Sequence, residues 1–255
     1  MSHRRTTAAG LGLLALLGTG AAPPEGPGTE GTMGVGIGSH EQRLGGCGGA
    51  QRAYRVTEPL GHVGVRHTRP DGFAVSGELS VGVGRQAEPN VEPGDLTPPE
   101  EVELDRDLLW TGVLALRAGK HGRHIGAEVG PALLRHDALG DGVKIMPSAQ
   151  VWAGKPSVAY AWTGIFAGPM SGAPEFFGLI GVGHRSRHVG ASIGTSFLGT
   201  VGEVDVRVGQ GMRMGLHAAA GRWYADQSSP DLRGMLRLTI DYGRAGQPAP
   251  PAEAR

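Results

Sequence analysis

The feature that most constrains this chain is a strict alternation of polar and apolar residues between His188 and Tyr242. In the first run, the even-numbered residues from 188 to 196 are glycine, serine or histidine, whereas the odd-numbered residues from 189 to 197 are mostly apolar. Similar runs follow at 203–208, 213–218 and 232–242. Successive side chains on a strand point to opposite faces, so each run predicts a strand with one polar and one apolar face.

The same pattern extends toward the N-terminus and predicts about twelve strands in all. Most of them are roughly 10 to 12 residues long, which suits strands that cross a membrane at a tilt. Residues 40–59 lack the pattern and are predicted to be irregular, apart from local pairing at 54–56. The predicted strands are 33–37, 61–67, 73–85, 108–118, 124–135, 143–153, 158–167, 176–185, 188–197, 201–208, 212–224 and 232–242.

Long and short connections between these strands broadly alternate, with 198–200 as the exception. Asp71-Gly72 is a strong hairpin-turn signal, and other short turns are expected at 119–123, 154–157 and 209–211. The longest connection, 86–107, is acidic and contains prolines, and it is expected either to be solvated or to bind divalent cations. Tight turns at one end and longer loops at the other are typical of an up-and-down barrel in an outer membrane. An even strand count then places both termini of the chain on the short-turn, periplasmic side.

The two termini read as segments outside the barrel. Residues 1–22 have a basic start, an apolar core and small residues at the end, as in an export signal peptide. We assign 23–30 to a Pro/Gly-rich spacer, 31–243 to the barrel and 244–255 to a disordered tail. The single cysteine, Cys47, cannot form an internal disulfide and is expected to be an inert loop thiol.

Composition adds two constraints. The formal net charge is +0 and the pI is near 7.2, which gives no basis for nucleic-acid binding. Glycine is abundant, with 46 residues, and it recurs at alternate positions inside the predicted strands. Glycine in strands marks sharp bends or crowded surroundings, and a closing barrel has both.

Aromatic residues and prolines test this interpretation. Outward-facing aromatics are expected near strand ends, with Phe73, Tyr160, Trp162 and Tyr242 toward the short turns and Trp110, Phe166, Phe177, Phe197 and Tyr224 toward the longer loops. Pro131 and Pro147 fall inside predicted strands and cannot donate to the ladder. In a barrel they would mark a bulge or a weak pairing; in a sandwich they would mark edges.

On these patterns the chain resembles bacterial outer-membrane β-barrel proteins as a class, over roughly residues 31–243, without matching a particular family. The predicted fold is an all-β, up-and-down antiparallel transmembrane barrel of 10–12 strands. We expect export to the outer membrane and contact with its lipids, with small solutes or anions as candidate partners and no cofactor. The expected role is a small passive pore or a structural surface protein, without enzymatic activity. The alternative is a soluble periplasmic or secreted all-β sandwich, acting as a binding module.

The polar faces of the strands carry a set of charged residues that would line the lumen of a barrel. In a sandwich the same residues would form the wet face of a sheet. Arginine outnumbers lysine in this set, which would favour anions at a constriction. The set comprises Arg66, Glu78, Arg117, Glu128, Lys144, Glu203, Asp205, Arg207, Arg213, Arg233, Arg237 and Asp241.

The sequence motifs for catalysis or metal binding lack the structural context that each of them requires. Gly190 to Gly194 matches G-x-S-x-G, but no helix pattern follows it, as a nucleophile elbow requires. A weaker alternative is a lipid-modifying barrel enzyme in which Ser192 or Ser196 pairs with His188 or His217. His184 and His188 flank a turn and do not share a face, so no metal site is predicted. The glycines at 34, 36 and 38 resemble a fragment of a dinucleotide-binding loop, but again no helix follows.

Overall fold

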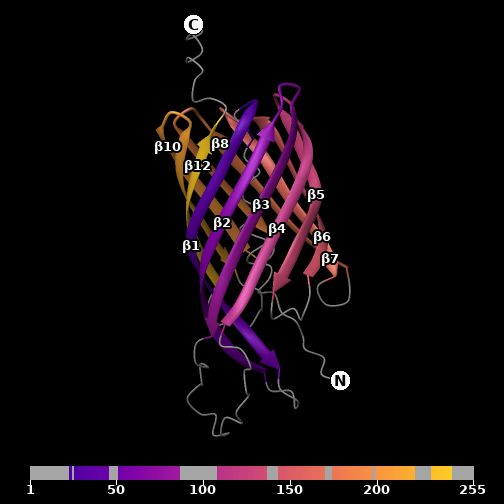
Figure 1. Cartoon of the computed structure of the whole chain (residues 1–255), viewed down its shortest axis with the longest axis vertical. Coiled ribbons are helices and arrows are strands. Elements are labelled where there is room, and N and C mark those ends of the chain that lie inside the picture. Colours follow the sequence, from indigo (N-terminus) through magenta and orange to yellow (C-terminus); the bar gives the residue numbers. More distant parts are fainter. Residues whose placement is uncertain are drawn as a thin grey trace, which may run out of the picture.

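This computed structural model describes residues 23–24, 26–45, 51–86, 108–136, 143–169, 174–196, 199–221 and 231–242, and these residues form twelve strands (Figure 1). The strands are β1 (Gly28–Gly45), β2 (Gln51–Thr68), β3 (Phe73–Gln86), β4 (Leu108–His121), β5 (Ile125–His136), β6 (Val143–Lys155), β7 (Ala159–Pro169), β8 (Pro174–Arg185), β9 (Val189–Ser196), β10 (Gly199–Gly209), β11 (Met212–Gly221) and β12 (Asp231–Asp241).

Each strand pairs antiparallel with its neighbours in sequence, and β1 closes the sheet against β12. The closing register runs without a break from Glu30 opposite Asp241 to Ser39 opposite Leu232. Closure leaves no edge strand in the wall, so backbone hydrogen-bonding groups find partners within the sheet. The predicted up-and-down barrel is confirmed, and its twelve strands lie within the predicted range of 10–12.

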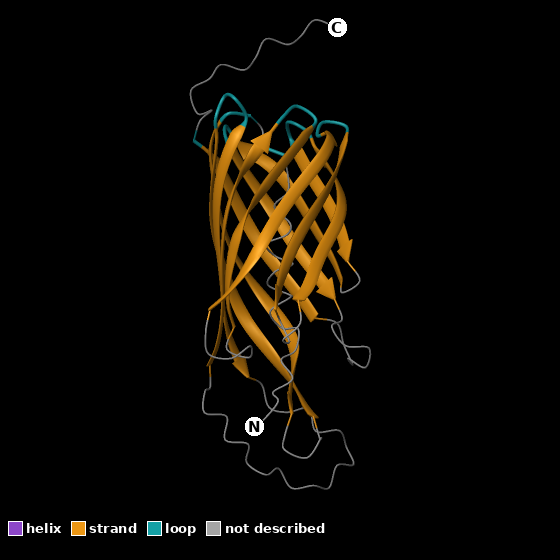
Figure 2. Ribbon diagram, turned by 90° about the vertical axis from the view of Figure 1, so that its right-hand side faces the viewer, coloured by secondary structure: helices purple, strands orange, loops and turns teal. Residues whose placement is uncertain are grey.

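The two ends of the barrel differ, as Figure 2 shows. The loops that the structure describes, at 69–72, 122–124, 156–158, 186–188 and 210–211, all lie at one end, which we call the short-turn end. The start of β1 and the end of β12 meet there too, where the Tyr242 N–H donates to the Thr29 carbonyl at 2.7 Å. At the Asp71-Gly72 hairpin, Gly72 has a φ of 82°, which favours glycine. The start of the first strand and the end of the last strand therefore both lie at the short-turn end, as expected for an even strand count.

Strand boundaries differ from prediction mainly at β1 and β2. β1 begins at Gly28, within the predicted spacer, and residues 40–45 and 51–59 are strand where the sequence predicted irregular chain. Beyond Ser39 and Val56, these two strands pair only with each other, so the β1–β2 hairpin extends past the wall at the opposite end, the long-loop end. The prediction failed because glycines and Pro59 interrupt the alternation, while the backbone pairing of a hairpin does not depend on it.

The outer surface of the barrel is apolar on every strand. Val35 on β1 and Ile180 on β8 are each 69% exposed, and the other ten strands also present exposed aliphatic or aromatic side chains. Val204, Val206, Val208 and Leu236 are among them, although a second sheet would cover these residues in a sandwich. The sandwich alternative is therefore incorrect.

The prediction that Tyr160 and Trp162 face outward is wrong. Both are 4% exposed and pack inside with Trp152, Leu179 and Val201. Trp162 faces Gly181 across β7–β8, and a Cβ on Gly181 would overlap its ring. Rings lie where neighbouring strands have no side chain, which explains part of the glycine content. Phe73 and Tyr242 are exposed at the short-turn end, as expected.

Pro131 and Pro147 face each other across β5–β6 and point outward. The β4–β5 register skips Gly130 and Pro131, continuing from Ala115 opposite Ala132 to Ala118 opposite Val129. The prolines thus mark a local irregularity in a wall that stays closed.

Several predictions concern residues outside the described part: the signal peptide 1–22, Cys47, the acidic loop at 87–107, Phe197, Tyr224 and the tail 244–255. The side chains of Trp110, Phe166 and Phe177 are also outside it. Among the described residues, no helix has the length and apolar character needed to cross a membrane.

Candidate functional site: the lumen

The charged residues singled out from the sequence lie on the inward-facing positions of their strands. Glu128, Arg117, Arg213 and Arg233 are buried, and the others are half-buried. Their placement follows from period two, because buried and exposed residues alternate along β6 and β11. The same alternation places three further members of the set on inward positions: Lys144, Arg207 and Asp241.

Glu128 on β5 is the centre of one ionic network. Its carboxylate accepts hydrogen bonds from the Ser76 hydroxyl at 2.6 Å and His121 Nε2 at 2.7 Å, and it pairs with Arg66 Nε at 3.0 Å. His121 Nδ1 in turn accepts from the Trp152 indole N–H at 2.9 Å. Arg66 is on β2, so this ion pair passes over β3 and β4 inside the barrel.

A second inward carboxylate, Glu78 on β3, pairs with Arg117 on β4 at 3.2 Å. Arg117 also donates from Nε to the Ser148 hydroxyl at 3.2 Å. The charges on the β2–β6 side of the lumen are thus held by contacts between several strands.

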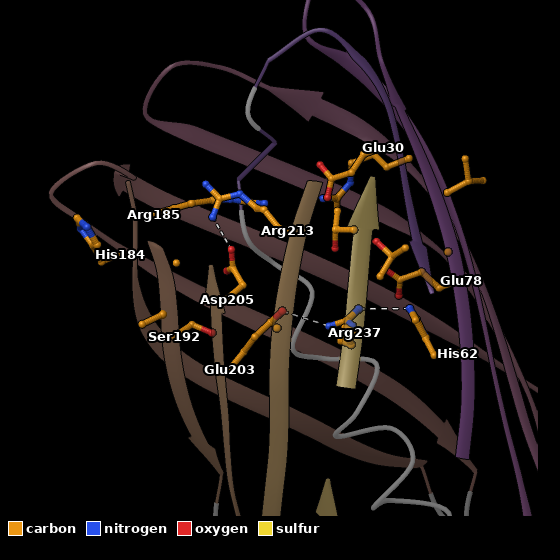
Figure 3. A pocket seen from close by; sticks show the side chains of 18 of the residues that line it. Glu30, His62, Glu78, His184, Arg185, Ser192, Glu203, Asp205, Arg213 and Arg237 are labelled. Atoms are coloured by element: carbon orange, nitrogen blue, oxygen red, sulfur yellow. Dashed lines mark hydrogen bonds and ion pairs between the residues drawn. The ribbon is translucent and has the colours of Figure 1, made fainter. Parts of the chain in front are cut away.

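On the β10–β12 side, Arg213 pairs with Asp205 and donates to the Ser186 carbonyl at 2.7 Å, which ties β11 to the β8–β9 turn. Arg237 lies 3.5 Å from Glu203, and its Nη2 lies 3.2 Å from His62 Nε2 (Figure 3). Arg185 donates to the Pro23 carbonyl at 3.1 Å, so the chain just before β1 contacts the lumen wall.

The glycines of β1 allow side chains of β12 and β2 to contact each other inside the lumen. Gly34, Gly36 and Gly38 occupy inward positions on β1, which lies between those two strands. A Cβ on Gly38 would lie 3.2 Å from Glu58 Cγ and 3.3 Å from Arg233 Cγ. Without side chains there, Arg233 pairs with Glu58 at 2.9 Å and Arg237 meets His62. The glycine repeat that resembled a nucleotide loop therefore has a packing role.

A cavity of about 60 Å³ lies near the short-turn end of the lumen. We call it the charged chamber. Its lining includes the hydroxyl-bearing residues Thr32, Tyr160, Ser192 and Thr239. Four carboxylates and four guanidinium groups also line it: Glu30, Glu78, Glu203 and Asp205, with Arg66, Arg185, Arg213 and Arg237.

Toward the long-loop end the inward side chains become largely apolar. We call this region the apolar layer; Glu58, Arg233, Thr111 and Asp231 are polar residues near it. The change occurs within single strands: β5 has Glu128 near the short-turn end and Leu134 near the other. The apolar layer consists of Val113, Ala115, Ala132, Leu134, Met146, Leu179, Val201 and Met235.

The serine–histidine pairs suggested by the sequence do not form. Both ring nitrogens of His217 lack a hydrogen-bond partner in the described part, and His188 lies exposed in a turn. Ser192 lies inside β9, which continues unbroken through the G-x-S-x-G match. Thus neither histidine is placed to activate Ser192 or Ser196.

One serine–histidine contact does form, between Ser80 and His62 Nδ1 at 2.9 Å. Arg237 is a donor only, so His62 Nε2 must be the acceptor. In neutral His62 the proton then sits on Nδ1, which donates to Ser80. A histidine that donates to the serine cannot take its proton, so this pair is not arranged as a nucleophile and base.

Sequence reasoning missed several inward polar residues, including Glu30, Glu58, His62 and Arg185. Glu58 fell in the segment predicted to be irregular, and Glu30 fell in the assigned spacer. The alternation within β2 places His62 on the same face as Arg66, so the spacing of two residues along the strand could have identified it.

Comparisons with known proteins give no family for this chain: neither a family model nor a curated protein matches it. Similar solved structures include the translocator domain of autotransporter NalP from Neisseria meningitidis (11% identity, TM-score 0.45, 90% of this chain and 94% of that one). Another is the Ralstonia pickettii toluene transporter TbuX (9% identity, TM-score 0.41, 85% and 90%). At these TM-scores neither likeness bears on what this chain does.

Proposed function

We propose that this chain is an outer-membrane β-barrel protein that acts as a small passive pore, without enzymatic activity. The observation that carries the proposal is the contrast between the two surfaces of the wall. Exposed apolar side chains occur on all twelve strands, whereas inward positions hold ion pairs and a polar cavity. An apolar surface of this extent marks a surface that faces membrane or another apolar partner.

Antiparallel closure supports a membrane location in a second way. Every backbone polar group in a bilayer must be paired, and a closed barrel achieves this. Tight turns at one end, longer connections at the other and the predicted export signal fit a bacterial outer membrane. The short-turn end would then face the periplasm.

The inner contacts support a pore of low conductance. Arg66–Glu128, Arg237–Glu203 and Arg233–Glu58 each pass over at least one strand inside the lumen and narrow it. The apolar layer adds a stretch that water wets poorly, and such constrictions oppose ion flow. Small solutes are the proposed cargo, and the carboxylates that line the lumen beside the arginines disfavour the simple anions expected from the sequence.

A second candidate, a structural or surface protein, is favoured by one specific observation. The β1–β2 hairpin extends beyond the wall at the long-loop end, where this strand pair would contact other surface molecules. This role requires no passage through the lumen.

The test of membrane insertion is cell fractionation, followed by electrophoresis of the membrane fraction with and without boiling. We expect the protein in the outer membrane, with a mobility that shifts only after boiling. Release into the soluble fraction without detergent would contradict the proposal. Planar-bilayer recordings then separate the two roles, because a pore gives small discrete currents and a purely structural barrel gives none.

A further inference from the structure

We propose that the charged chamber binds a small zwitterion, such as a free amino acid. The inference deepens the proposed function and rests on it, because it names the class of solute that the pore would admit. Four observations support it: the charge balance of the lining, the positions of its charges, two groups left unpaired, and its size.

The lining of the charged chamber is balanced, with four carboxylates and four guanidinium groups. A simple anion in this space meets repulsion from the carboxylates, and a simple cation meets repulsion from the guanidinium groups. A molecule that carries one charge of each sign can face attraction at both ends.

The carboxylate without an arginine partner in the described part of the chain, Glu30, also lies apart from the arginines of β8 and β11. Arg185 and Arg213 project on one side of the chamber, where Arg213 pairs with Asp205 on β10, and Glu30 and Glu78 project from β1 and β3 on the other (Figure 3). Arg66, on the acidic side, is engaged by Glu128 at 3.0 Å. A zwitterion is therefore oriented with its ammonium group toward β1 and its carboxylate toward β8 and β11.

Two groups in the chamber are left available for a ligand. The Glu30 carboxylate has no hydrogen bond or ion pair within the described residues, although Glu78, Glu203 and Asp205 each have an arginine partner. The Nε of Arg237 is buried and also unpartnered. Glu30 can accept from an ammonium group, and Arg237 Nε can donate to a carboxylate.

The size of the chamber limits the ligand. A volume of about 60 Å³ holds only a few water molecules. Among zwitterions it admits the smallest, such as glycine, and the hydroxyl of Ser192 supplies a further polar contact.

Calorimetric titration of the full-length protein in detergent, shown to be folded by its mobility shift, tests the proposal. The probes are glycine and its two half-molecules, acetate and methylammonium. We expect saturable glycine binding at least about tenfold tighter than either half-molecule, because only glycine satisfies both signs of charge. Equal affinity for all three probes would overturn the proposal, and this comparison needs no variant.

Glu30→Gln should weaken glycine binding by roughly tenfold or more, since a hydrogen bond between charged groups is lost, and should leave acetate binding unchanged. Glu30→Asp should recover part of the affinity. Asp71→Asn is the matched control, because Asp71 is exposed in a turn outside the chamber. Equal effects of the Glu30→Gln and Asp71→Asn changes would sink the inference.

The outcomes separate the inference from the proposed function. A barrel that conducts but binds glycine no better than acetate contradicts the zwitterion site and leaves the pore intact. A barrel that binds glycine selectively but gives no current supports the site and contradicts the pore.

Discussion

The charged chamber and the apolar layer lie in the same lumen but are stabilised in different ways. Around the charged chamber, ion pairs and hydrogen bonds join strands that are up to three positions apart in the barrel, as in Arg66–Glu128. Near the apolar layer, side chains such as Leu134 and Met146 are buried without polar partners. One half therefore depends on particular pairs and the other on packing, so single substitutions should have different consequences in the two halves.

The largest effect is expected from Glu128→Ala. The change leaves Arg66, His121 and Ser76 without their shared acceptor, and a buried cation without a counter-charge costs about 3 to 5 kcal/mol. Urea unfolding of the protein in lipid vesicles would measure the loss. Asp71→Asn, in the exposed pair with Arg69, should change stability by less than about 1 kcal/mol. Comparable losses in the two variants would show that the network does not stabilise the barrel.

A smaller loss is expected from Gly181→Ala on the aromatic side of the lumen. The added methyl group would overlap the Trp162 ring and lie 2.5 Å from the Ile193 carbonyl oxygen, and overpacking of this kind costs about 1 to 3 kcal/mol. Gly112→Ala is the control, because nothing lies within 4 Å of a Cβ at that position. In a Trp162→Ala background the cost of Gly181→Ala should shrink. A cost that stays unchanged would mean that ring contact is not its cause.

A direct test of the apolar layer, measured as conductance and not as stability, comes from a neighbouring pair on β6. Met146 faces inward at 1% exposure and Ile145 faces outward at 67%. Met146→Ser should raise single-channel conductance, because a polar group makes the constriction easier to wet. Ile145→Ser should leave conductance unchanged. If both variants conduct like the wild type, the apolar layer does not limit the current.

The glycine and aromatic pattern shows how far sequence reasoning reached. Alternation predicted the strands, the barrel and the inward positions of Arg213 and Glu203, since period two is a local property of the backbone. It failed at Tyr160 and Trp162, where either face of β7 could have been taken as the apolar one. The inward position of these two rings depends on Gly181 and Gly183, which lie opposite them on β8. The register between two strands cannot be predicted from the sequence of either strand alone.

The sequence by itself therefore determined the approximate strand number, the hairpin turns and the two-faced character of the wall. The tertiary structure decided which inward side chains meet. Ser76 and Glu128 are 52 residues apart, and Arg237 and His62 are 175 residues apart. Such residues come together only once the barrel has closed and the registers of all twelve strands are set, because the height of each side chain in the lumen depends on every pairing between them.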